Sequence, residues 1–84
     1  MANPKRVTLF TTQACKWCKV AKAYLEDNDI EYVEVDIIHD AQARQRMALM
    51  TGQYGVPVLE IGSRAMVGWD EAEFQRLYHL KPKS

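Results

Sequence analysis

Two cysteines three positions apart, Cys15 and Cys18, are the only cysteines of this 84-residue chain. They follow the apolar segment Val7–Thr11, which has the composition of a buried strand, and they begin a segment with the periodicity of an amphipathic helix. Side chains at i and i+3 lie on one face of a helical turn. The two thiols are therefore predicted to lie close enough to form, break and re-form a disulfide with each other.

The rest of the chain alternates between strand and helix patterns. Strand patterns cover residues 33–37, 56–61 and 64–67, and helix patterns follow Asp40 and Asp70, which are both suited to capping. Gly52 is a stop signal for the second helix. The predicted inward faces of the three helices are, in order, Trp17, Val20, Ala21, Tyr24 and Leu25; Ala43, Met47, Met50 and Tyr54; and Phe74, Leu77 and Tyr78.

The order strand–helix–strand–helix–strand–strand–helix predicts an α/β fold. A right-handed crossover makes the first two strands parallel, and a tight turn at Gly62-Ser63 makes the last two antiparallel. We therefore expect one mixed four-stranded sheet with helices on both faces, in a single domain spanning residues 1–84. The strand at residues 33–37 has one apolar and one polar face, which is typical of a sheet edge.

Composition argues against several classes of protein. A disulfide between residues so close in sequence removes little entropy from the unfolded chain, so the pair is not expected to be a structural staple. The chain has no run of ~18 apolar residues and no apolar amino-terminal segment, so we expect neither a membrane span nor a secretory signal. The expected compartment is the reducing cytoplasm, where an isolated Cys-x-x-Cys is more often catalytic than structural. The net charge is zero and aromatic and basic residues do not interleave, which argues against nucleic-acid binding.

The predicted chemistry of the pair is thiol–disulfide exchange, which needs a thiolate as nucleophile. Cys15 lies at the start of the predicted helix, where unpaired amide N–H groups and the helix dipole favour a negative charge. The cations Lys16, Lys19 and Lys22 follow it and favour the thiolate further. Cys18 lies one turn into the helix and is more shielded. We therefore predict that Cys15 attacks the substrate and that Cys18 resolves the mixed disulfide.

Two features are open to more than one interpretation. The cysteines alone are also compatible with inert thiols or half a metal site, since structural zinc takes four ligands. Neither His39 nor His79 has a spacing that links it to the pair, so no metal site is predicted. Pro57 is compatible with an ordinary strand start, where a missing N–H does little harm. A cis bond between Val56 and Pro57 would instead offer the backbone of Val56 to an extended thiol substrate.

Three segments together resemble the glutaredoxins, and among them the small glutaredoxin-like donors that include the NrdH-redoxins. They are Cys15-Lys16-Trp17-Cys18, Thr51-Gly52 with Gly55-Val56-Pro57, and Val67-Gly68-Trp69-Asp70. The resemblance spans residues 7–78. It implies a thioredoxin fold, a cis bond before Pro57 and dithiol–disulfide reductase activity.

The resemblance also implies a site for glutathione as co-substrate, with no bound cofactor. Cys15 would form the mixed disulfide, and the backbone of Val56 would pair with the cysteinyl part of glutathione. The stretch Gly68-Trp69-Asp70-Glu71 would receive the γ-glutamyl carboxylate at a helix N-terminus. Arg44 and Tyr54 match positions that reach the glycyl carboxylate.

The chain departs from the usual glutaredoxin pattern at three places. Thr12 stands where a lysine is usual, Val67-Gly68 replaces paired glycines, and Lys16-Trp17 replaces Pro-Tyr between the cysteines. The first two departures weaken the glutathione site and lean toward the NrdH-like group, which is reduced by thioredoxin reductase, whereas Arg44 and Asp70-Glu71 keep parts of a glutathione site. The reductant therefore stays open.

The aromatic residue between the cysteines, Trp17, fits either the inward helix stripe or an exposed position at the active site, and we favour the exposed position. Trp69 is expected at the rim of the site. The leading function is a monomeric electron carrier that reduces protein disulfides, including those of ribonucleotide reductase, or glutathione mixed disulfides. The alternative is an iron–sulfur module in which two subunits bridge a cluster. The absence of a proline after Cys15 loosens the turn and would permit this.

Overall fold

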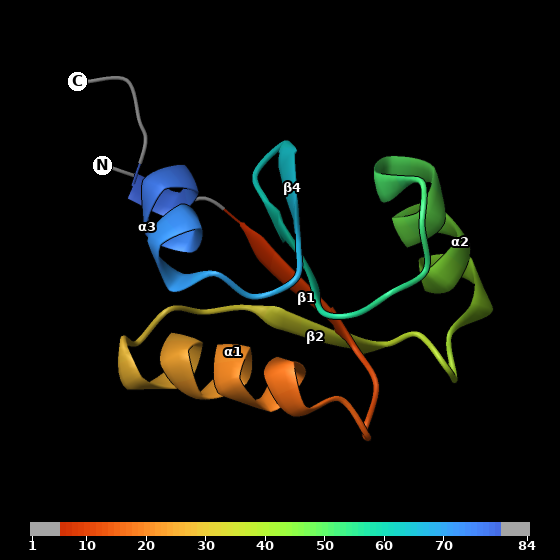
Figure 1. Cartoon of the computed structure of the whole chain (residues 1–84), viewed down its shortest axis with the longest axis horizontal. Coiled ribbons are helices and arrows are strands. Elements are labelled where there is room, and N and C mark those ends of the chain that lie inside the picture. The colour runs from red at the N-terminus through yellow and green to blue at the C-terminus, as the bar shows by residue number, and fades with distance from the viewer. Residues whose placement is uncertain (1–5, 80–84) are drawn as a thin grey trace.

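The computed structural model describes residues 6–79; residues 1–5 and 80–84 of the predicted domain lie outside the described part. The sheet has the strand order β2-β1-β3-β4 (Figure 1). β1 pairs in parallel with β2 and antiparallel with β3, and β3 pairs antiparallel with β4, so the predicted fold class and strand directions are confirmed. The elements are β1 (Val7–Thr11), α1 (Lys16–Asp27), β2 (Val33–Asp36), α2 (Ala41–Thr51), β3 (Val58–Ile61), β4 (Arg64–Val67) and α3 (Glu71–His79).

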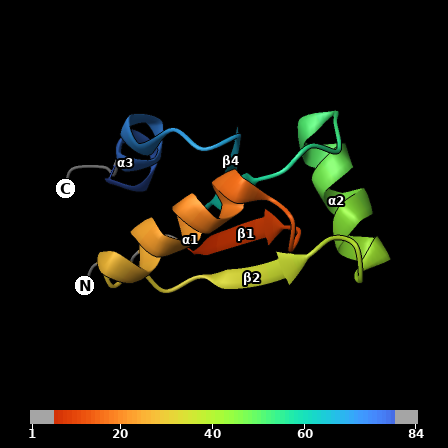
Figure 2. The same cartoon turned by 60° about the horizontal axis from the view of Figure 1, so that its bottom comes forward.

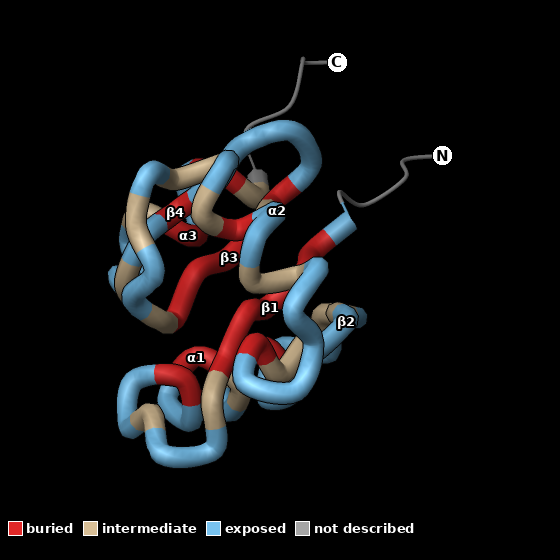
Figure 3. Tube along the Cα trace, turned by 90° about the vertical axis from the view of Figure 1, so that its right-hand side faces the viewer, coloured by how far each residue is buried: buried red, intermediate tan, exposed pale blue. Residues whose placement is uncertain are grey.

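Helices cover both faces of the sheet, as predicted. α1 and α3 lie against one face and α2 lies on the other (Figures 1 and 2). The α1–α3 face holds the larger core cluster, which includes Leu9, Leu25, Leu59 and Phe74. The α2 face holds a smaller cluster of Phe10, Ile37, Met47 and Val58. Figure 3 shows the consequence along the trace, with the central strands β1 and β3 buried and the edge strand β2 largely exposed.

The ends of the helices follow their predicted capping residues. Asp40 accepts a hydrogen bond from the N–H of Ala43 at the start of α2, and Gly52 ends α2 in the left-handed region at φ 74°. Asp70 likewise accepts from the N–H of Glu73 at 3.2 Å. These local signals explain why the helices begin and end where they do.

Three residues of the predicted inward helix faces are exposed. For Trp17 the exposed position was the favoured alternative, whereas the inward predictions for Val20 and Tyr54 are wrong. Val20 is 41% exposed, because the buried face of α1 consists of Cys18, Ala21 and Leu25 and is therefore rotated away from Val20. Tyr54 is 64% exposed, because it follows Gly52 and no longer belongs to the helix whose periodicity placed it inward.

Within residues 6–79, no helix combines the length and the apolar character needed to cross a membrane.

Candidate active site

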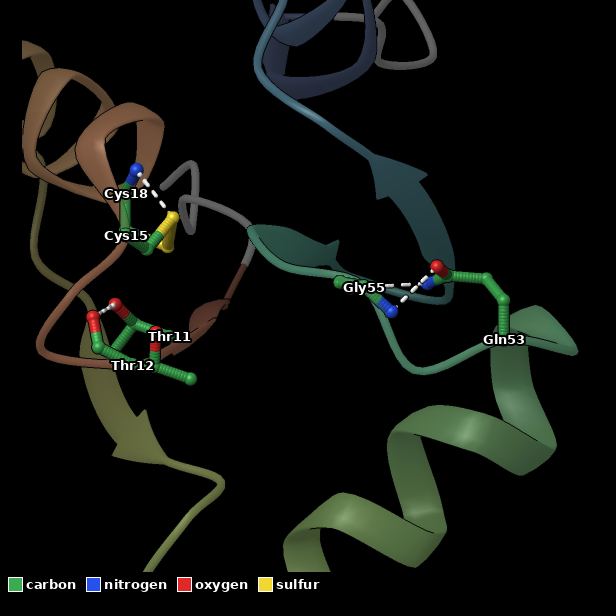
Figure 4. Close-up of a disulfide and its surroundings, with 6 residues drawn as sticks. All are labelled: Thr11, Thr12, Cys15, Cys18, Gln53 and Gly55. Atoms are coloured by element: carbon green, nitrogen blue, oxygen red, sulfur yellow. Dashed lines mark hydrogen bonds between the residues drawn. A yellow bond between two sulfur atoms is a disulfide. The ribbon is translucent and has the colours of Figure 1, made fainter.

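Cys15 is the N-cap of α1, and its sulfur takes the place that a capping oxygen usually occupies. Its Sγ accepts a hydrogen bond from the backbone N–H of Cys18 at 3.0 Å, and the two cysteines are joined by a disulfide with their Cα atoms 5.2 Å apart (Figure 4). Cys18 is only 2% exposed, whereas Cys15 is partly accessible. Cys15 is thus the more accessible of the two residues and Cys18 is the shielded one; which of them attacks the substrate stays a prediction.

The loop before Cys15 is held by backbone and hydroxyl groups. The N–H of Cys15 donates to the carbonyl of Thr12, and the hydroxyl of Thr11 donates to the same carbonyl. The carbonyl of Thr11 in turn accepts from the N–H of Ile37, the residue that follows β2. The predicted site residue Thr12 therefore acts through its carbonyl in shaping the turn that carries the cysteine.

The charged side chains that follow Cys15 in the first turns of α1 are basic. Lys16 and Lys19 are exposed, and the first turn of α1 contains no acidic residue. Lys22 was expected to favour the Cys15 thiolate together with Lys16 and Lys19. Its ammonium group instead forms an ion pair with Glu34 on β2, at 3.1 Å. Lys16 and Lys19 are therefore the cations of α1 that remain for an anionic thiol.

The peptide bond between Val56 and Pro57 is cis, which confirms the expectation drawn from the family resemblance. The antiparallel register pairs Phe10 with Val58, so continuing it by two residues sets Val56 opposite Thr12, just before the cysteine loop. Within the described residues, no hydrogen bond reaches the backbone N–H or C=O of Val56. This free donor and acceptor at the end of the sheet suit pairing with an extended ligand.

A third segment reaches the same end of the sheet after β4. Gly68, at φ 85°, donates its N–H to the carbonyl of Pro57 at 2.8 Å. Trp69 packs its ring against Tyr24, with ring centroids 5.3 Å apart, and against Phe74. Trp69 is thus half-buried between α1 and α3 and anchors the loop.

The capping carboxylate Asp70 and the first residue of α3, Glu71, are both exposed. The aromatic between the cysteines, Trp17, is 56% exposed, which confirms the preferred interpretation of this residue. Tyr54 is a second exposed aromatic, in the loop that leads to the cis peptide bond.

The side chain of Arg44 is hydrogen-bonded to the loop that follows β2. Its Nη1 donates to the carbonyl of Ile37 at 2.9 Å, and the N–H of Ile37 is bonded to Thr11 as described above. A guanidinium has five N–H donors, and the guanidinium of Arg44 makes no second hydrogen bond or ion pair within residues 6–79. Arg44 therefore keeps donors available for an anion.

Asp36 and His39 lie at the same end of the sheet, since Asp36 pairs with Thr11 in the parallel register. Asp36 accepts from the N–H of Ile38, and its second oxygen lies 3.0 Å from Nδ1 of His39. The His39 interaction first, and then the Ile38 N–H, hold the pKa of Asp36 below its ordinary value. His39 is thereby tied to a carboxylate and not to the cysteines, and the side chain of His79 lies outside the described part.

Sequence reasoning missed Gln53, which it passed over between two glycines. Its side-chain oxygen accepts from the N–H of Gly55 at 2.6 Å, and its side-chain nitrogen donates to the carbonyl of Gly55 at 3.1 Å (Figure 4). The only signal in the sequence was a glutamine inside a glycine-flanked loop, which does not specify such bonds.

A cavity near the start of β1 does not contain the cysteines. It has a volume of about 660 Å³ and is lined by residues that include Val7 at the start of β1, whereas the cysteines follow the end of that strand. Because redox exchange needs the sulfur atoms, we place the active site at the disulfide and not in this cavity. In the described part of the chain, no cluster of three or more His, Cys, Asp or Glu side chains is suited to a metal ion.

A disulfide at the N-terminus of α1, with a cis-proline across the sheet end, defines a thiol–disulfide oxidoreductase of the thioredoxin fold. Comparison with known proteins agrees. The glutaredoxin family model matches residues 7–66. A glutaredoxin-like 8.6 kDa protein from the rubredoxin operon of Clostridium pasteurianum is 35% identical over 71 residues, which is 84% of this chain and 95% of that protein.

Two further proteins are similar to this chain, one in sequence and one in structure. Glutaredoxin 3 of Escherichia coli (strain K12) is 31% identical over 71 residues, covering 84% of this chain and 82% of that protein. The solved structure of the glutaredoxin-like NrdH-redoxin from Escherichia coli superposes with a TM-score of 0.78 over 92% of this chain and 99% of that one, at 22% identity, which supports the fold alone. This chain belongs to the glutaredoxin family.

Proposed function

We propose that this protein is a cytoplasmic, monomeric electron carrier that reduces protein disulfides or glutathione mixed disulfides through Cys15 and Cys18. The observation that carries the proposal is the position of the Cys15 sulfur, which accepts the Cys18 N–H at the start of α1 while Cys18 itself is buried. A thiolate formed there is favoured by the amide and by the helix dipole.

The exchange runs in two balanced steps. The Cys15 thiolate attacks the sulfur of R–S in a client disulfide R–S–S–R′. A new S–S bond joins Cys15 to that sulfur, the S–S bond of the client breaks, and R′–S⁻ leaves and takes up a proton. The deprotonated Cys18 then attacks the sulfur of Cys15, forms the disulfide seen in the structure and releases R–S⁻, which is also protonated. Two electrons pass from the dithiol to the client.

The proposed substrate contacts surround the disulfide on three segments. The free backbone groups of Val56, next to Pro57, would pair with the cysteine-containing part of the substrate. When glutathione is the co-substrate, the N-terminal end of α3 would receive its γ-glutamyl carboxylate. The proposed contact residues are Thr12, Lys16, Trp17, Arg44, Tyr54, Val56, Pro57, Gly68, Trp69, Asp70 and Glu71.

The reductant is proposed to be glutathione or a thioredoxin reductase. The free donors of Arg44 support glutathione. The NrdH-redoxin that shares the fold is described as having a thioredoxin-like activity profile, which supports the second reductant. Ribonucleotide reductase is proposed as one client on the family resemblance alone. Oxidised protein offered glutathione with glutathione reductase, and separately thioredoxin reductase, would consume NADPH only with its proper reductant.

The assignment of roles is tested with two single variants. Cys15→Ser should abolish disulfide reduction because no nucleophile remains, and Cys18→Ser should accumulate a mixed disulfide that mass spectrometry detects. Full turnover by Cys15→Ser, or an adduct on Cys18 in that variant, would refute the assignment. The iron–sulfur alternative stays a prediction, and a brown dimer obtained by anaerobic expression would support it.

A further inference from the structure

The loop between α2 and the cis peptide bond is closed by a side chain. Gln53 makes two hydrogen bonds to one residue, accepting from the N–H of Gly55 and donating to its carbonyl. This is the pattern that a neighbouring strand would make with an extended residue. The amide of Gln53 is itself anchored, because its nitrogen lies 3.3 Å from the hydroxyl of Thr51, which donates to the carbonyl of Met47 in α2.

The two hydrogen bonds from the Gln53 side chain, here called the Gln53 closure, have room to form because residue 55 is a glycine. A Cβ built on Gly55 would lie 2.8 Å from the Gln53 oxygen, which is closer than real Cβ atoms approach. The φ of Gly55 is not in the left-handed region, so the backbone conformation does not require glycine. A side chain at position 55 would instead displace the end of the Gln53 side chain and break its hydrogen bonds to Gly55.

The closure lies directly before the proposed substrate-pairing residue. Gly55 precedes Val56, and Pro57 on the other side is held by the bond from the N–H of Gly68 to its carbonyl. Val56 is therefore fixed on both sides while its own N–H and C=O have no partner in the described part of the chain. Groups held in place before binding lose less entropy when a ligand pairs with them.

We propose that Gln53 is a positioning residue, which sets the backbone of Val56 for an extended cysteine-containing peptide by holding Gly55. The proposal rests on the proposed function, because it assumes that the substrate pairs with Val56. Gln53 does not touch the reacting sulfurs, so it acts on substrates with a peptide backbone and not on the sulfur chemistry itself.

The test compares two disulfides that differ in their ability to pair with a backbone. Reduced protein reacts in stopped flow with the disulfide of acetyl-Ala-Cys-Ala-amide and with 4,4′-dithiodipyridine, which has no peptide group. The ratio of the two second-order rate constants is the readout. In Gln53→Ala this ratio should fall about tenfold, because the pairing groups are no longer held. Gln42→Ala, an exposed glutamine of α2, is the matched control and should keep the wild-type ratio.

A second variant keeps the side-chain size and adds a pH signature. In Gln53→Glu the carboxylate accepts from the N–H of Gly55 but has no proton for the Gly55 carbonyl, so the ratio should be reduced at pH 7. Protonation restores a donor, and the ratio should return toward the wild-type value as the pH falls toward the ordinary glutamate pKa of about 4.3. Circular dichroism reports whether each variant is folded. If Gln53→Ala is unfolded, the pH dependence of Gln53→Glu tests the positioning role instead.

Each outcome has a defined meaning. A wild-type ratio in Gln53→Ala, or a Gln53→Glu ratio that does not change with pH relative to the wild type, overturns the positioning role. Failure of the wild-type protein to reduce either disulfide would contradict the proposed function instead.

Discussion

Replacing Gly68 by alanine tests how the loop before α3 holds the cis-proline segment. Gly68 has a φ of 85°, and a Cβ added there meets no atom within 4 Å. The substitution is therefore free of collisions, and its cost is confined to the backbone. An L-residue in the left-handed region costs roughly 1–2 kcal/mol, and the stiffer unfolded chain of alanine returns ~0.4–1 kcal/mol. The expected net loss in the free energy of unfolding is about 1 kcal/mol.

Urea unfolding of the oxidised protein measures this loss directly, and thermal unfolding should show a midpoint lower by roughly 4–8 °C for a chain of this size. Gly52→Ala is the matched control, because Gly52 has a φ of 74° and the same open surroundings. Both variants should lose similar free energies, and Gly68→Asn should lose less, since asparagine tolerates the left-handed region. A Gly68→Ala protein as stable as the wild type, or less stable by more than about 3 kcal/mol, would refute the reasoning.

Three further variants probe other parts of the structure. Asp36→Asn should flatten the loss of stability that urea unfolding of the wild type shows as the pH falls below about 4. The lowered pKa of Asp36 means that the native state favours the carboxylate, so this contribution to stability is present above pH 3.8 and is lost as the pH falls through the native pKa. Arg46→Met should lose about 0.5–1 kcal/mol, and less at high salt, because Arg46 pairs with Glu60 at 3.0 Å on a partly exposed surface. Phe74→Ala should lose about 3–5 kcal/mol in urea unfolding, because its fully buried ring joins α3 to the core.

The order and ends of the elements were predictable because their causes are local. A carboxylate three residues before a free N–H caps a helix wherever the chain goes, as Asp40 and Asp70 do. A glycine such as Gly52 ends a helix for an equally local reason. The place of Cys15 at the start of α1 followed from the same kind of signal.

The buried face of α1 was misplaced because Cys18 was treated only as a reactive thiol. A buried cysteine packs as a small apolar residue, and counting it as one centres the stripe on Cys18, Ala21 and Leu25, away from Val20. The periodicity of the sequence would therefore have placed the buried face of α1 correctly if Cys18 had been counted as an apolar residue.

The closure by Gln53 was beyond sequence reasoning for a different reason. A side-chain amide can bond to many backbone groups in a loop, and only the path of the chain between Thr51 and the cis peptide bond decides which one it meets. The same holds for Arg44, whose bond to the carbonyl of Ile37 depends on how α2 lies relative to the loop that follows β2.

The free backbone of Val56 is informative because the rest of the molecule is so well satisfied. Among residues 6–79, every buried side-chain nitrogen and oxygen has a hydrogen-bond partner, and the neighbours Gly55 and Pro57 both have theirs. A chain that pairs both flanking residues yet leaves the half-buried Val56 unpaired keeps a strand position open. Since the antiparallel register directs that position toward the loop of Cys15, a peptide that fills it would bring its own sulfur toward the nucleophile.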